Sequence, residues 1–244
     1  MRALDKLTEV VDGRRRIISH PPLIVRAEGR QREEELAKAS AFYARYRETL
    51  TLDRQVLINQ FSLIDVARKV VGVGSVGTHC MVLLLEAGDG TPLFLQIKQA
   101  VASVLEPYLG KSLFKQAGQR VVLGQRLIQA TSDLFLGWAR WVDDKGPEID
   151  FYVRQLWDGK GKIDIEEMSA ARLSFFSGIC GKTLAFAHAR SGDPVMISGY
   201  LGDDKSFDDY LVAFAERYAD RTVQDHAQLC AAIESAQIAA VRDI

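Results

Sequence analysis

The sequence predicts an α+β fold in which an antiparallel β-sheet comes first and a helical region follows. Short β-prone runs separated by turn residues occupy residues 63–157, and helical patterns fill residues 166–244. The polar segment 158–162 separates them and is the best candidate for a linker. With 244 residues and 48% hydrophobic content, the chain can bury a large core. We therefore expect an N-terminal segment (1–62), a sheet lobe (63–157) and a helical lobe (158–244).

The N-terminal segment is predicted to start irregularly and to continue as helix. Glycine and proline residues interrupt any periodic pattern up to about residue 29. Residues 33–49 carry apolar side chains at helical spacing, which predicts an amphipathic helix. Thr51 or Asp53 can cap a second helix over about residues 54–61.

Five strands are predicted in the sheet lobe. Three come first, and the turn Gly88-Asp89-Gly90 joins the second to the third. Two more follow a stretch with helical periodicity. The predicted strands are 63–71, 78–86, 93–99, 134–141 and 149–157, with helices over 100–108 and 116–132 between the third and the fourth. In the helical lobe we predict helices over 166–190, 207–219 and 225–244.

A glycine-rich turn joins the first two predicted strands and suggests a ligand class. The segment Val70–Thr78 contains Gly72, Gly74, Ser75 and Gly77, and Lys98 closes the third strand. Glycines let backbone N–H groups approach phosphate oxygens, and a lysine on a neighbouring strand supplies the compensating charge. This pattern indicates a nucleotide phosphate site.

Two better-known phosphate motifs do not fit this turn. In a dinucleotide site a helix follows the glycines, whereas the run after Gly77 is β-prone. An acidic residue is also expected about twenty positions on, where Lys98 stands. The Gly-Lys-Ser/Thr ending of a P-loop is absent. An ordinary hairpin, with Lys98 solvated on a sheet edge, remains the alternative.

Composition limits the partners and the compartment. The net charge of −1 gives no basic field for nucleic acid or for an anionic membrane, and no run is long enough to span a bilayer. Cys80, Cys180 and Cys230 lie far apart in apolar surroundings, which predicts buried thiols in a reducing cytosol. The four histidines show no ligand spacing, so no metal site is predicted. A cytoplasmic protein is expected.

The predicted order of elements resembles that of protein-kinase-like folds. These have a five-stranded antiparallel sheet with a crossing helix, followed by a helical lobe, and the lysine pairs with a glutamate on that helix. Glu106 is the candidate partner of Lys98, although Pro107 follows it directly. Arg154 and Gln155 in the fifth strand, and Trp157 after it, border the expected cleft, where an adenine can bind. Plain packing of the aromatic side chain is the alternative. The layout implies ATP with Mg²⁺ as the ligand.

Four separated segments resemble the bacterial proteins of domain of unknown function 2252, a family without a known activity. They are residues 68–78, 118–122, 151–155 and 187–193, and the similarity runs from about Leu4 to Tyr218. Longer members carry a preceding part with His-Gly-Asp and Asp-Phe-Asp segments, which resemble the catalytic and metal-binding loops of aminoglycoside-phosphotransferase-like kinases. Neither segment occurs in these 244 residues, so this chain looks like the C-terminal part of such a protein.

Weak catalytic candidates remain in the segment 187–193. Asp193 can accept a hydroxyl proton and Arg190 can hold a phosphate, with His188 beside them. However, position 198 is a serine where a kinase loop has an asparagine. The alternative is a helix end, at which His188 and Arg190 complement the helix dipole.

The sequence therefore predicts the nucleotide-binding portion of a kinase-like protein that lacks the usual acidic loops. If it is active, it is a phosphotransferase with an unknown small-molecule or protein acceptor. The alternative is a non-catalytic scaffold, or a truncated domain that needs a missing N-terminal segment or a partner, with self-association as one outcome.

Overall fold

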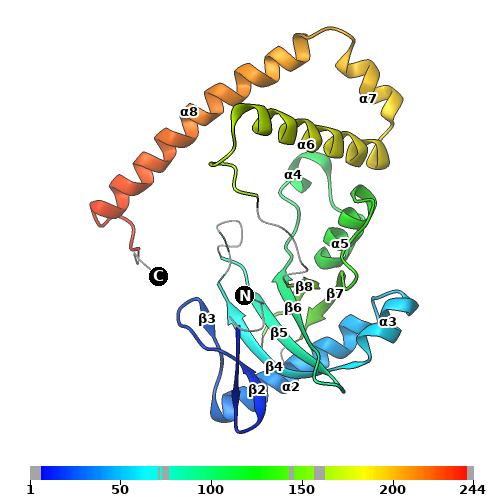
Figure 1. Ribbon diagram of the computed structural model, residues 1–244, viewed down its shortest axis with the longest axis vertical. Coiled ribbons are helices and arrows are strands. Elements are labelled where there is room, and N and C mark those ends of the chain that lie inside the picture. Colours follow the sequence, from blue (N-terminus) through cyan, green and yellow to red (C-terminus); the bar gives the residue numbers. More distant parts are fainter. Residues whose placement is uncertain (1–6, 71, 73–76, 143–145, 157–162, 241–244) are drawn as a thin grey trace. The chain divides into compact units, whose positions relative to one another are not determined.

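A six-stranded antiparallel sheet forms the centre of the first part of the chain (Figure 1). The computed structural model describes residues 7–70, 72, 77–142, 146–156 and 163–240. The strand order is β3-β4-β5-β6-β8-β7. The strands are β3 (Ile24–Val25), β4 (Phe61–Lys69), β5 (Cys80–Ala87), β6 (Pro92–Gln99), β7 (Gly137–Trp141) and β8 (Ile149–Gln155).

Two compact units make up the chain, Met1–Thr183 and Leu184–Ile244. The first unit holds the sheet, and the second holds helices alone. An α+β class with a helical C-terminal region is therefore confirmed. Trp157 and the predicted linker 158–162 lie outside the described residues.

Strands β4 to β8 confirm the five predicted strands with small shifts at their ends. The sheet nevertheless has a sixth strand, β3, which pairs with the end of β4. With only two residues, β3 shows no alternation that a sequence pattern can reveal.

The prediction of an irregular N-terminus is wrong. Residues 8–17 form a hairpin of β1 (Thr8–Val11) and β2 (Arg14–Ile17). Asp12 and Gly13 both have positive φ, 51° and 73°, as a two-residue hairpin turn requires. Gly13, which interrupts the sequence pattern, thus forms the hairpin turn together with Asp12.

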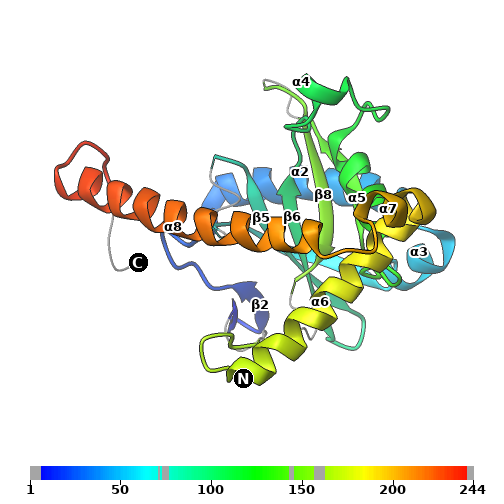
Figure 2. The ribbon, with the colours of Figure 1, turned by 90° about the horizontal axis from the view of Figure 1, so that it is seen from above.

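Helix α2 (Gly29–Arg47) covers one face of the sheet (Figure 2). Its buried side chains, Phe42 among them, pack on side chains of alternate positions in the strands, such as Leu95 and Ile97 of β6. The rings of Phe42 and Phe151 meet edge to face, with 5.8 Å between their centroids. We call this side of the sheet the α2 face. The shorter helix α3 (Leu52–Ile58) follows α2, as predicted.

The N-terminal hairpin covers part of the opposite side, which we call the hairpin face. Leu7 and Ile17 pack there on Leu84 and Phe94, and Leu156 joins the same cluster. This second core is smaller than the core under α2.

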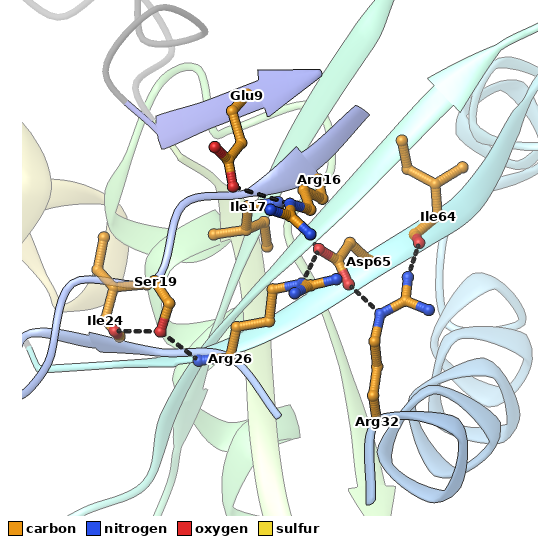
Figure 3. Close-up of polar contacts among 9 residues, drawn as sticks. All are labelled: Glu9, Arg16, Ile17, Ser19, Ile24, Arg26, Arg32, Ile64 and Asp65. Atoms are coloured by element: carbon orange, nitrogen blue, oxygen red, sulfur yellow. Dashed lines mark hydrogen bonds and ion pairs between the residues drawn. The ribbon is translucent and has the colours of Figure 1, made fainter. Parts of the chain in front are cut away.

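A fully buried carboxylate on β4 holds the hairpin in place (Figure 3). Asp65 accepts a hydrogen bond from the backbone N–H of Ile17 at 2.9 Å. It also pairs with Arg26 at 2.8 Å and with Arg32, at the start of α2, at 3.3 Å. Because a buried carboxylate is costly without partners, these contacts tie the N-terminal segment to the sheet.

Between β6 and β7 lie the helices α4 (Glu106–Leu109) and α5 (Ala117–Ile128). The predicted helix over 100–108 is thus a single turn, in which Pro107 stands in the first turn rather than ending a longer helix. Gly118 brings α5 against β8, since a Cβ there would lie 2.1 Å from the Phe151 carbonyl oxygen. A side chain at position 118 would push the helix off the strand.

The C-terminal helices are α6 (Ala170–Ser191), α7 (Pro194–Leu201) and α8 (Ser206–Glu234). Figure 2 shows α8 as one uninterrupted helix, so the prediction of two helices over 207–244 is wrong there. Residues 220–224 contain no glycine or proline that would interrupt it. The sequence also did not indicate α7, which begins with Pro194 directly after its cap, Asp193.

Candidate functional site: the lysine face of the sheet

The glycine-rich turn and Lys98 lie at the same end of the sheet. In the described part of the turn, Gly72 and Gly77 are exposed, and Gly77 has a φ of +77°, which favours glycine. Gly74 and Ser75 lie outside the described residues. Cys80 of β5 is the register partner of Lys98 on β6, so Lys98 stands beside the strand that leaves the turn.

Alternation along β6 places Lys98 on the hairpin face. Phe94 belongs to the core under the hairpin, whereas Leu95 and Ile97 belong to the core under α2. Gln96 and Lys98 therefore follow Phe94 on the hairpin face, because side chains alternate along a strand. Phe94 and Gln96 are buried, and Lys98 is partly exposed.

Strand β8 brings two further side chains beside Lys98. Tyr152 is the register partner of Lys98, and Arg154 is the partner of Gln96, which places Arg154 diagonally across from Lys98. We call the set Cys80, Gln96, Lys98, Tyr152 and Arg154 the lysine face.

The carboxylates on the hairpin face are neutralised by arginines. The ion pairs are Asp65 with Arg26 and Arg32, Glu86 with Arg15 at 3.7 Å, and Asp150 with Arg140 at 2.7 Å. Within the described ranges, no ion pair joins Lys98 or Arg154 to a carboxylate. The lysine face therefore keeps two positive charges at the end of the sheet where the glycine-rich turn begins.

Two acidic groups of the lysine face stay neutral near pH 7. Burial raises the pKa of the Cys80 thiol, while Lys98 and Lys69 lower it by a smaller amount. Burial likewise raises the pKa of the Tyr152 hydroxyl, with a smaller opposing effect of Arg154. Neither group cancels the charge of Lys98.

The expected pairing of Lys98 with Glu106 does not appear among the described residues. Glu106 opens the four-residue helix α4, and no ion pair links it to Lys98. The longer helix α5 contains no acidic residue. Among the described residues, Lys98 therefore has no carboxylate partner on either helix.

A cavity of about 630 Å³ lies at the same end of the sheet. Its walls include Gly77, Met81 and Phe151, and Lys98 is not part of them. Met81 and Phe151 place part of its wall on the α2 face, whereas Cys80, another lining residue, belongs to the lysine face. The cavity therefore adjoins the lysine face at Cys80, and Gly77 of the glycine-rich turn lies in its wall.

The catalytic candidates of the second unit lie at helix ends. His188 and Arg190 stand in the last turn of α6. Asp193 caps α7, accepting hydrogen bonds from the N–H groups of Val195 at 2.9 Å and Met196 at 3.1 Å. The Asp193 carboxylate thus accepts hydrogen bonds from the start of α7, as an N-cap does, which agrees with the helix-end interpretation.

Metal and membrane signals are weak in the part of the chain that the structure describes. No group of three or more histidine, cysteine, aspartate or glutamate side chains converges there as a metal site would require. None of its helices combines the length and apolar character needed to cross a membrane. Of the three cysteines expected to be buried, Cys80 is buried, Cys230 is partly exposed and Cys180 is exposed.

A family model described as "Uncharacterized protein conserved in bacteria (DUF2252)" matches residues 1–232. The chain belongs to this family. Searches of curated proteins and of solved structures found no match. Membership confirms the family resemblance seen in the sequence, and the description of the family names no activity.

In this DUF2252 chain, sequence patterns missed two residues of the lysine face. Lys98 and Arg154 stand out in the sequence, but Gln96 and Tyr152 do not. The available signal is the polar alternation near the end of β6, where Gln96 and Lys98 alternate with Leu95 and Ile97. The pairing of β6 with β8 shows which residues accompany them.

Proposed function

We propose that this chain is the nucleotide-binding portion of a kinase-like protein, and that the lysine face holds the phosphates of ATP. The observation that carries the proposal is the pair of cations, Lys98 and Arg154, left without a carboxylate partner in the described strands. Phosphate oxygens form short, charge-assisted hydrogen bonds with such groups. Amides of the turn that contains Gly72, Gly74, Ser75 and Gly77 complete the proposed site.

The kinase-like part of the proposal is supported by the order of elements. The glycine-rich turn joins β4 to β5, Lys98 lies on β6, and helices α4 and α5 precede β7 and β8. Strand β6 lies between β5 and β8, so its lysine is central in the sheet. These are the parts that kinases use to hold the phosphates of ATP.

Phosphoryl transfer needs more than this site. A catalytic base and metal-binding side chains are required, and the sequence carries neither of the loops that resemble them in longer relatives. Mg²⁺ binds largely through the phosphates and water in such sites, so it would arrive with ATP. We therefore propose binding of ATP with Mg²⁺, and a phosphotransferase activity only with groups supplied from elsewhere.

The proposal is tested by thermal unfolding with increasing ATP and Mg²⁺. A ligand that binds the folded state raises the melting temperature in proportion to the logarithm of its concentration over Kd. We expect such a rise for the wild-type chain and for Lys115→Ala, which removes an exposed lysine outside the lysine face. We expect its loss in Lys98→Ala. An equal rise in both variants, or none at millimolar ATP, would overturn the proposal.

A second candidate function is a non-catalytic scaffold that binds a protein partner. It is favoured by the apolar side chains of the second unit, where no residue of α7 or α8 is buried. Tyr200 is 80% exposed, Tyr210 76% and Val195 79%. Large exposed apolar patches mark interaction surfaces. Sedimentation of the purified chain measures whether it self-associates. Self-association at micromolar concentration would support an interaction surface on the second unit. A strict monomer would count against one that binds a second copy.

A further inference from the structure

A third cation stands next to the lysine face, at the end of β4. Lys69 is the last residue of this strand, and Ala67, two positions before it, packs in the core under the hairpin. Because side chains alternate along a strand, Lys69 lies on the hairpin face as well. Its register partner on β3, Ile24, belongs to the same core. Lys69 and Lys98 therefore share one face of the sheet.

Cys80 lies between these two lysines. Arg68 and Met81 are register partners in the pairing of β4 with β5, so the next step along both strands sets Lys69 opposite Cys80. On its other side Cys80 is the partner of Lys98. Side chains in directly opposite positions have Cβ atoms roughly 5 Å apart. Both ammonium groups lower the pKa of the Cys80 thiol, although burial raises it by more, which agrees with a lysine on each side.

With Arg154, the two lysines form a row of cations across neighbouring strands. Lys69 lies on β4, Lys98 on β6 and Arg154 on β8, and β5 separates the first two. Three strand spacings separate β4 from β8, which is roughly 14 Å. A single phosphate would draw three long side chains to one point and restrict their rotamers, which is entropically unfavourable. A chain of phosphates can meet each cation near its own strand.

The charge of Lys69 is as available as those of the other two cations. In the ranges that the structure describes, no ion pair joins Lys69, Lys98 or Arg154 to a carboxylate. All three side chains are partly exposed. Lys69 also lines the cavity at this end of the sheet, so this end of the row is open to a ligand. Like charges held this close repel one another, and a polyanion relieves the repulsion.

We infer that the lysine face binds a chain of at least two phosphates, and that Lys69 is the cation that selects for this length. The inference rests on the phosphate site proposed above and adds to it a further binding residue and a ligand preference. Each phosphate that reaches a cation gains charge-assisted hydrogen bonds. Affinity should therefore rise with the number of phosphates, and part of that rise should depend on Lys69.

The inference is tested by isothermal titration of the full chain with two inorganic probes, orthophosphate and tripolyphosphate. We expect tripolyphosphate to bind at least about tenfold more tightly than orthophosphate. Lys69→Ala should weaken tripolyphosphate binding about tenfold, the effect of losing one charge-assisted hydrogen bond, and should change orthophosphate binding by less than about twofold. Lys69→Arg keeps the charge and should retain the wild-type preference. Lys115→Ala, which removes an exposed lysine outside the row, is the matched control and should behave as wild type.

The outcomes separate this inference from the nucleotide proposal. If Lys98→Ala weakens tripolyphosphate binding and Lys69→Ala does not, the inference is overturned and the phosphate site stands. If tripolyphosphate binding depends on both lysines and ATP does not bind, the row of cations stands and the nucleotide proposal fails. Absence of saturable tripolyphosphate binding at millimolar concentration would overturn the inference outright. Circular dichroism checks that each variant is folded, and Lys69→Gln, which keeps most of the side chain, replaces Lys69→Ala if the latter unfolds.

Discussion

The two faces of the sheet differ in how completely they are covered, although the same strands build both. On β6 the α2 face carries Leu93, Leu95 and Ile97, all buried. The hairpin face carries Phe94, Gln96 and Lys98, so the side chains change along the strand from apolar to polar to charged. The change shows where the apolar cover of the hairpin ends. Because the hairpin covers one end of this face and the other end is polar, the same face can provide both a core and a binding surface.

The covers are also held in different ways. Helix α2 is held by apolar and aromatic packing. The hairpin is held in addition by the hydrogen bond from Ile17 to Asp65, and the ion pair of Asp65 with Arg32 also ties α2 to β4. Substitutions on each face separate these contributions.

The α2 face should be the most sensitive to truncation. Phe42→Ala removes a fully buried ring that meets Phe151 and Trp141, and should lower the free energy of unfolding by about 3–5 kcal/mol. Urea denaturation followed by circular dichroism measures this change in the free energy of unfolding. Val56→Ala, at a 62% exposed position of α3, is the control and should change stability by less than about 0.5 kcal/mol. Similar losses in both would contradict a core at Phe42.

The stability of the hairpin face should depend on the negative charge of Asp65. Asp65→Asn keeps the size of the side chain but leaves Arg26 and Arg32 without a counter-charge, which should cost about 3 kcal/mol. Glu9→Gln breaks the exposed pair with Arg16 and should cost no more than about 1 kcal/mol in the same urea titration. Equal effects of the two changes would show that the buried cluster does not hold the hairpin.

Alkaline pH should weaken the α2 face through its tyrosines. Burial raises the pKa of Tyr43 to about 12, so the folded state keeps the hydroxyl neutral where the unfolded state already ionises. Stability should therefore be unaffected below pH 10 and fall between pH 10 and 12. Tyr43→Phe should make this fall shallower without removing it, because burial also raises the pKa of Tyr46. Melting temperatures from pH 8 to 11 measure the difference, and identical slopes would contradict it.

The lysine face should contribute least to stability. Lys98→Ala removes a partly exposed charge that forms no ion pair among the described residues, so the free energy of unfolding should change by less than about 0.5 kcal/mol. The urea midpoint without ligand measures this. A loss above about 2 kcal/mol would mean that Lys98 is a structural residue, and the comparison of the two faces would have to be revised.

The sequence predicts the five long strands because each carries a β-prone run bounded by turn residues. It does not predict β3, whose two residues become a strand only by pairing with Arg68 and Lys69. Lys98 can be singled out from its motif, whereas Tyr152 cannot. The position of Tyr152 beside Lys98 depends on the register between β6 and β8, two strands far apart in the sequence. Such contacts between distant segments are not encoded in local patterns.

The phosphate site is tested by the affinity of the folded chain for ATP with Mg²⁺, measured by isothermal titration in wild type and in Lys98→Ala. Removing one charge-assisted contact to phosphate should weaken binding at least about tenfold, while Lys115→Ala stays at the wild-type value. Equal Kd values for wild type and Lys98→Ala would contradict a phosphate site on the lysine face.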